Sequence, residues 1–106
     1  MELSLNDIKE LVTGEQPTTD NGGFVVGKKV FIRTVTHYYL GLVESISATT
    51  IVLSSASWVA DTGLFSEMLA SGTINEVEPY ADNVTVSRGA IIDHTHWRHS
   101  LPKERK

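Results

Sequence analysis

The sequence predicts a mainly β fold with two short helices, folded as one small and strongly bent barrel of five strands. Residues 27–53 are crowded with β-branched and aromatic side chains and contain no proline, so every backbone N–H there can join a sheet. Gly41 stands inside this stretch, where a missing side chain marks a bend or bulge. At 106 residues without cysteine, the chain has the size of a single domain that needs no disulfide. We expect one domain over residues 1–97, followed by a basic flexible tail over residues 98–106.

The first expected element is an N-terminal helix over residues 5–13. Ser4 stands at the helix cap, and Gly14 provides a stop. An apolar stripe at helical spacing is formed by Leu5, Ile8, Leu11 and Val12. Because an isolated helix of this length is marginal in water, its stripe should dock on the barrel or on a neighbouring subunit. Residues 15–23 form a linker rich in turn-forming residues.

Five strands and a helical insertion are expected in the rest of the domain. The strands are predicted over residues 28–36, 38–47, 50–56, 73–78 and 84–95, and the last of them is kinked at Gly89. Between strands three and four, residues 58–72 form a helical insertion. Its apolar residues Leu64, Phe65, Met68 and Leu69 share one face, and Gly72 ends it.

The charge of the chain is uneven. Its formal net charge is −4, which divides into −7 for residues 1–97 and +3 for the tail. The negative charge of residues 1–97 argues against binding to nucleic acid, because it repels the phosphate groups. No apolar run is long enough to span a membrane, and the acidic N-terminus does not have the pattern of a secretory signal. We therefore expect a cytoplasmic or virion-associated protein.

Two groups of residues resemble motifs of the Sm-like family, which includes the Sm, LSm and bacterial host-factor proteins. The first motif is matched by Gly27, Val30, Ile32, Tyr39, Gly41, Val43, Ile51 and Leu53. The second is matched by Val84, Val86, Arg88, Gly89, Ile91 and Ile92. The resemblance implies an SH3/Sm-like barrel of five strands with an N-terminal helix. It also implies a ring, in which strand five of one subunit pairs with strand four of the next.

Contacts between copies and contacts with RNA follow from this resemblance. We expect the oligomer interface to involve Ile74, Val77, Val84, Val86 and Trp97. Single-stranded RNA, the usual ligand of the family, would be bound by Arg88, with Tyr38 and Tyr39 as a stacking platform. The Asp and Asn that the family carries in the loop between strands two and three are absent here, which argues against RNA binding. Adjacent tyrosines also commonly cover a barrel mouth or fill an interface.

Three histidines near the end of the last strand form a candidate metal site. His94 and His96 share one face of a strand, and with His99 they could hold Zn²⁺ or Ni²⁺. The alternatives are ordinary polar roles at a strand end, or a contact that responds to pH. No nucleophile and base, phosphate loop or paired carboxylates are visible. We therefore expect no catalytic residues, no cofactor and no enzymatic activity.

The sequence as a whole favours a non-enzymatic structural module that assembles with copies of itself. The product would be a homo-oligomeric ring, a tube or a component of a larger particle, such as a phage or bacterial assembly. Its partners would be its own copies and other subunits of the assembly. The alternative is an Sm-like protein that binds single-stranded RNA.

Overall fold

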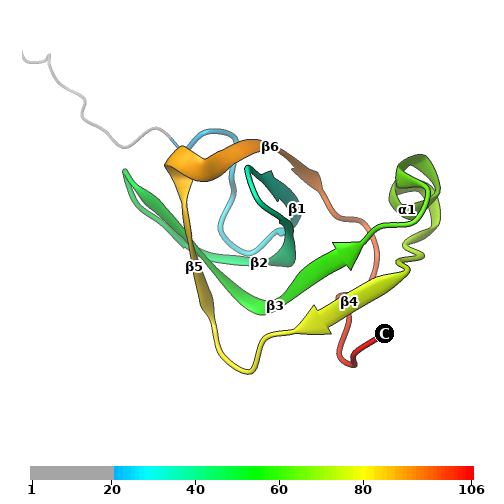
Figure 1. Cartoon of the computed structure of the whole chain (residues 1–106). Coiled ribbons are helices and arrows are strands. Elements are labelled where there is room, and N and C mark those ends of the chain that lie inside the picture. The colour runs from blue at the N-terminus through cyan, green and yellow to red at the C-terminus, as the bar shows by residue number, and fades with distance from the viewer. Residues whose placement is uncertain (1–20) are drawn as a thin grey trace, which may run out of the picture.

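The computed structural model describes residues 21–106 of the chain, and it confirms a mainly β protein. It contains six strands, one α-helix and a single 3-10 turn over these residues (Figure 1). In chain order the elements are β1 (Lys29–Thr34), β2 (Tyr38–Ile46), β3 (Thr50–Asp61), α1 (Phe65–Ser71), β4 (Glu76–Pro79), β5 (Val84–Ser87), η1 (Arg88–Ala90) and β6 (Ile91–His96). α1 is too short to cross a membrane, and no other α-helix lies within residues 21–106.

All six strands belong to one antiparallel sheet, in the order β4-β3-β2-β1-β6. β5 also pairs with β3, on the same side as β4, so that β4 and β5 follow one another along the length of β3. No ladder joins β6 to β4 or β5, and the sheet is therefore open. The predicted small, strongly bent barrel of five strands is therefore wrong, because the structure has six strands in one open sheet.

The break in the predicted last strand explains why the sheet stays open. Residues 84–95 were expected to run as one kinked strand, but η1 divides them at Arg88–Ala90. The first part pairs with β3 and the second with β1, so each part has a partner on one side only. The expected N-terminal helix over residues 5–13 lies outside the described residues. The helix that is described, α1, lies between β3 and β4.

β3 is longer than the sequence predicts. Ser55 adopts a positive φ of 46°, and the pairing of β3 with β2 shifts register beside it, between Leu40 and Leu42. Beyond this irregularity the strand continues through Trp58 to Asp61. Residues 58–61, expected in the helical insertion, are therefore part of the sheet, where Trp58 and Val59 suit a pleated surface.

The sheet buries apolar side chains on both faces. One cluster contains Phe24, Val30, Ile32, Val43, Ile51, Leu53, Ala56 and Val86. The other contains Phe31, Leu40, Val59, Met68, Ile74, Val77 and Trp97. In β1, Val30 and Ile32 point to the first cluster and Phe31 to the second, which accounts for its uninterrupted apolar sequence.

Residues 98–106, expected as a flexible tail, contact the second face. The His99 imidazole Nε2 lies 2.9 Å from the Leu69 carbonyl oxygen, and the Lys29 ammonium donates to the His99 carbonyl at 2.6 Å. Further along, the backbones of Lys106 and Val77 exchange two hydrogen bonds, of 2.9 and 3.0 Å. This segment therefore runs beside α1 and reaches the outer side of β4.

Candidate functional site

The three residues expected to bind RNA are not brought together. Tyr38 and Tyr39 are neighbours on β2 and point to opposite faces of the sheet. The Tyr38 ring packs 5.7 Å from the ring of Phe31, whereas Tyr39 packs against the other cluster. The Arg88 guanidinium donates a hydrogen bond to the Ser47 carbonyl oxygen at 2.7 Å. This hydrogen bond stabilises the turn between β2 and β3.

The three histidines of the expected metal site have separate surroundings. His94 stacks on the Phe24 ring at 3.8 Å, and its Nε2 lies 2.8 Å from the Gly22 carbonyl oxygen. His96 is exposed, and His99 is bound to Leu69 beside α1. Among residues 21–106 no group of three His, Cys, Asp or Glu side chains is placed to hold a metal ion.

The side chains expected at the oligomer interface lie in the core of the chain itself. Those that are fully buried are Ile74, Val77, Val86 and Trp97, and Val84 is half-buried. They cannot also form a surface for another copy. Any contact through β4 or β5 would have to use the backbone of the strand or the exposed side chains between these residues.

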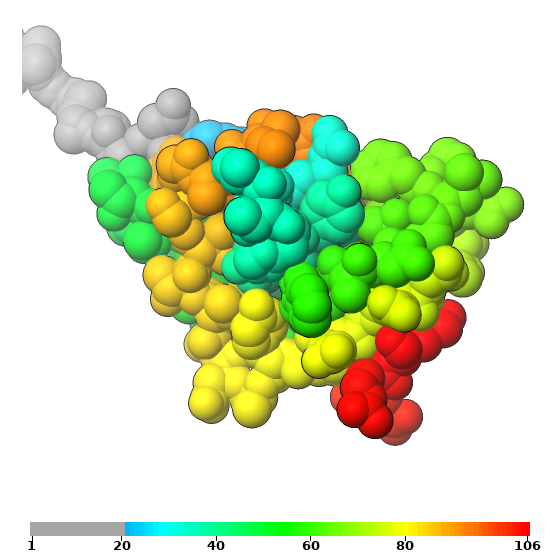
Figure 2. Space-filling view, viewed as in Figure 1, coloured from blue at the N-terminus to red at the C-terminus, as the bar shows by residue number. Residues whose placement is uncertain are grey.

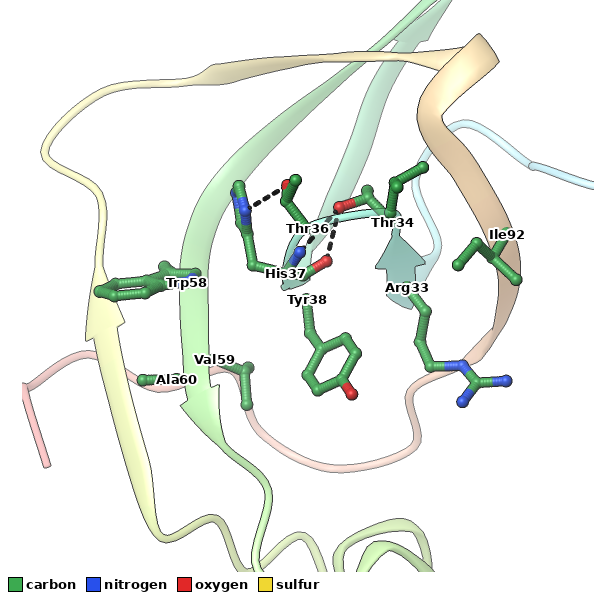
Figure 3. A pocket seen from close by; sticks show the side chains of 10 residues that line it. Arg33, Thr34, Thr36, His37, Tyr38, Trp58, Val59, Ala60 and Ile92 are labelled. Atoms are coloured by element: carbon green, nitrogen blue, oxygen red, sulfur yellow. Dashed lines mark hydrogen bonds between the residues drawn. The ribbon is translucent and has the colours of Figure 1, made fainter.

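A surface pocket of about 450 Å³ surrounds the turn between β1 and β2 (Figure 3). It is lined by the turn residues 34–37, by Arg33 and Tyr38 on either side of them, by Trp58, Val59 and Ala60 of β3, and by Ile92 of β6. The space-filling view shows the turn at the surface between the residues of β6 and β3 (Figure 2). Trp58 contributes an aromatic side chain to this pocket, and 37% of its surface is exposed.

Hydrogen bonds already engage the polar side chains of Thr34, Thr36 and His37, which line this pocket. The His37 Nδ1 lies 2.8 Å from the Thr36 hydroxyl, and its Nε2 lies 2.7 Å from the Tyr39 hydroxyl. The Thr34 hydroxyl donates to the His37 carbonyl at 2.6 Å. With both of its ring nitrogens paired, His37 shapes the turn and is poorly placed to act as a base.

A bidentate ion pair joins β1 to β6 beside the pocket. The Arg33 Nε donates to one Asp93 carboxylate oxygen at 2.8 Å, and its Nη2 donates to the other. Hydrogen bonding to the guanidinium lowers the pKa of Asp93, and the same contact raises the pKa of Arg33. The two charges neutralise one another, so the pocket does not present a free cation at this position.

The outer side of β6 carries free backbone groups. The Trp97 N–H donates to the Lys29 carbonyl at 3.1 Å, which fixes the alternation of the ladder between β1 and β6. It follows that Thr95 and Asp93 bond to β1, while the N–H and C=O groups of His94 and His96 point away from it. These outward groups form no hydrogen bond with any other part of the described chain.

β5 has a free side of the same kind. The Arg88 N–H donates to the Thr49 carbonyl at 2.8 Å, so Val84 and Val86 bond to β3. The N–H and C=O groups of Thr85 and the N–H of Ser87 therefore point outward and make no hydrogen bond within residues 21–106, whereas the Ser87 carbonyl, at the N-cap of η1, accepts the first hydrogen bond of that turn. Sequence reasoning missed these residues because the direction of a backbone group depends on register, which the residue pattern does not reveal.

The outer side of β4 is different, because it is guarded. This strand has only four residues, contains Glu76, Glu78 and Pro79, and is covered at Val77 by the backbone of Lys106. Charges, proline and a covering segment are the devices by which proteins blunt a sheet edge. β5 has none of them, and its sequence is Val-Thr-Val-Ser.

Comparison with known proteins places the chain in no family: no family model, no curated protein and no solved structure matches it.

Proposed function

We propose that this protein is a non-enzymatic structural module that assembles with copies of itself through its sheet edges. The free side of β6, at His94 and His96, pairs with the free side of β5, at Thr85 and Ser87, in the next copy. The two edges differ, so the contact is head-to-tail. Such a contact closes into a ring if its rotation closes, and otherwise continues as a filament.

The observation that supports this proposal is the contrast between the guarded β4 and the unguarded β5 and β6. Unpaired edge groups are a template for pairing with another chain, and proteins that stay monomeric usually protect them. Here the edge at β4 carries two acids, a proline and a covering backbone, while the adjoining edge at β5, a strand of the same four-residue length, carries none. The outward groups at each free edge are spaced two residues apart, as a strand partner requires.

Backbone pairing alone does not supply micromolar affinity. Because the Ser87 carbonyl is used within η1, the outward residues of the two strands can exchange about three hydrogen bonds, with a net value of roughly 1.5–4.5 kcal/mol in total. A Kd of 1 μM corresponds to about 8 kcal/mol. Apolar side chains beside the edge must add the difference, and Ile92 at the start of β6, which is 64% exposed, is placed to do so.

Proline substitutions test this proposal, because proline removes one N–H and is tolerated on an edge where that N–H faces outward. Light scattering with mass determination on the full chain at tens of micromolar should show an oligomer. Thr85→Pro and His96→Pro should each abolish larger assemblies, while the matched controls Thr85→Ala and His96→Ala should not. Circular dichroism checks that all four variants keep their β structure.

Mixing the two proline variants distinguishes the geometries. Thr85→Pro retains a working β6 edge and His96→Pro a working β5 edge, so an equal mixture should form a 1:1 dimer and nothing larger. A wild-type chain that is monomeric at these concentrations refutes the proposal. Oligomers that persist in both proline variants place the contact elsewhere and refute the edge pairing.

A further inference from the structure

Positive charge is concentrated at the end of β6, beside its free edge. A surface pocket of about 480 Å³ at this end is lined by Gly27, Lys28, Lys29, His96 and Trp97. His96 also lines a second groove, together with Arg98. Lys28 and Arg98 are exposed, and neither forms an ion pair within residues 21–106. These residues make a basic end of β6, to which an acidic group would be attracted.

Negative charge lies at the start of β5, beside the other free edge. Asp82 is in the turn before β5 and forms no ion pair within the described chain. The residues on either side of this turn are held by β3, and residues 81–83 stand opposite only Ser54 and Ser55. The turn therefore cannot lie flat against β3, and its three residues are exposed. A cation, Arg88, follows the other end of β5, and its guanidinium is bonded only to a neutral carbonyl.

This difference between the two ends of β5 favours one direction of pairing over the other. In an antiparallel contact, His96 of one copy lies opposite Thr85 of the next. Three residues further, about 10 Å along the strand, Asp82 then reaches the basic end of β6. In a parallel contact, Arg88 reaches that end instead. Opposite charges facing each other across two strands stabilise the pair and like charges destabilise it, so the antiparallel contact is favoured.

We infer that β5 and β6 of neighbouring copies meet antiparallel, with Asp82 of one copy bound at the basic end of β6 in the other. The inference rests on the proposed edge pairing and specifies its direction and its charged contact. Exposed charges at the margin of a contact add little affinity, but they fix the register and disfavour the reversed arrangement. The turn before β5 is therefore the segment that selects the partner edge.

The mixture of the two proline variants allows this one contact to be measured, because it should form only a 1:1 dimer. The His96→Pro chain supplies β5, and the Thr85→Pro chain supplies β6. Asp82→Lys in the first chain and Arg98→Glu in the second should each raise the Kd by about tenfold at low ionic strength, because an attraction becomes a repulsion. Combining the two substituted chains should bring the Kd below that of either single substitution, since the charges are again opposite. Isothermal titration calorimetry measures all four combinations.

Matched changes of charge away from the contact are the controls. Glu67→Lys, in the chain that supplies β5, lies on α1, which follows the end of β3, whereas β5 pairs with the start of β3 (Figure 1). Arg105→Glu, in the chain that supplies β6, lies beside Lys106, whose backbone is bonded to β4. Both residues are exposed, and each substitution should change the Kd by less than about twofold. Circular dichroism checks that every variant keeps its β structure.

The failure of this inference and the failure of the proposed function give different results. A dimer whose Kd is unchanged by Asp82→Lys overturns the antiparallel contact and leaves the edge pairing intact. A tighter dimer with Arg98→Glu also overturns it, because a parallel contact would then be relieved of repulsion from Arg88. Losses that add in the combined pair show that Asp82 and Arg98 do not meet, and they overturn it as well. If the two proline variants form no dimer at tens of micromolar, the edge pairing fails and the inference fails with it.

Discussion

Gly41→Ala should destabilise the protein through a single steric clash. A Cβ at Gly41 would lie 2.9 Å from the Leu53 Cβ and 3.3 Å from the Ser54 carbonyl oxygen. Gly41 is buried at the point where the pairing of β2 with β3 shifts register, so neither strand can move aside freely. Overpacking of this kind costs roughly 1–3 kcal/mol in the free energy of unfolding. For a domain of about this size, that lowers the Tm by about 5–20 °C.

The control for this prediction is Gly89→Ala. The nearest atom to a Cβ at Gly89 is the Ser87 hydroxyl oxygen at 3.8 Å, an ordinary contact distance, and its φ is not positive. Alanine there reduces the entropy of the unfolded chain and should leave the stability unchanged or raise it by up to about 1 kcal/mol. Urea unfolding followed by circular dichroism measures both variants with one protocol.

A double variant tests whether the clash is with the side chain of Leu53 or with its Cβ. Leu53→Ala keeps the Cβ that lies 2.9 Å away and removes the Cδ1 that lies 3.3 Å away, so it should relieve Gly41→Ala only in part. Because the two residues are in contact, the loss of stability in the double variant should be smaller than the sum of the two single losses, by about 0.5 kcal/mol or more. The reasoning is refuted if Gly41→Ala unfolds within about 0.5 kcal/mol of wild type, because the close approach of β2 and β3 would then not exist.

Three further outcomes follow from individual contacts. Ser57 is fully buried, and its hydroxyl has no hydrogen-bond partner within residues 21–106. Ser57→Ala should therefore leave the free energy of unfolding in urea unchanged or raise it by up to about 1 kcal/mol. A clear loss of stability would show that the hydroxyl has a partner. Thr34→Val should lower the free energy of unfolding by about 1–3 kcal/mol, because the buried hydroxyl forms hydrogen bonds of 2.6 and 3.1 Å with the backbone of the turn. Thr36→Val, at an exposed position, should lower it little in the same assay. Equal losses in the two variants would contradict this account. The pKa of Asp93 is lowered by its hydrogen bond to Arg33, so this pair contributes stability above about pH 4 that is lost as the pH falls through the lowered value. A carboxyl titration followed by NMR should therefore give a normal pKa in Arg33→Ala, and a pKa that stays low would assign the shift to another group.

Local features of this fold could be predicted from the sequence because they depend on neighbouring residues. The β-branched and aromatic run of residues 28–53 indicated strands, and the mainly β class is confirmed. Gly41 was identified as a bend, and it lies at a register shift in β2. These signals need only side-chain shape and backbone freedom, which are properties of the residues themselves.

The pairing of distant strands could not be predicted in the same way. Residues 84–95 read as one strand because Val84, Val86, Ile91 and Ile92 are all strand formers. Whether such a run stays one continuous strand depends on its two partners, β3 and β1, whose paired residues lie 31 to 64 positions earlier in the chain. The burial of Ile74 and Val77 within the chain could not be predicted for the same reason, because it depends on how β4 packs on the rest of the sheet.

The distribution of burial limits how this protein can meet a partner. Both faces of β1 are covered, one by Phe24 and the first cluster and the other by α1 and the segment after Trp97. A sheet whose two faces are occupied can offer only its edges and the rims of its turns. Of the edges described, β4 is guarded and β5 and β6 are not. Because an unguarded edge is a liability unless something covers it, the outer side of β5 is where the proposed assembly is best tested, by Thr85→Pro against Thr85→Ala.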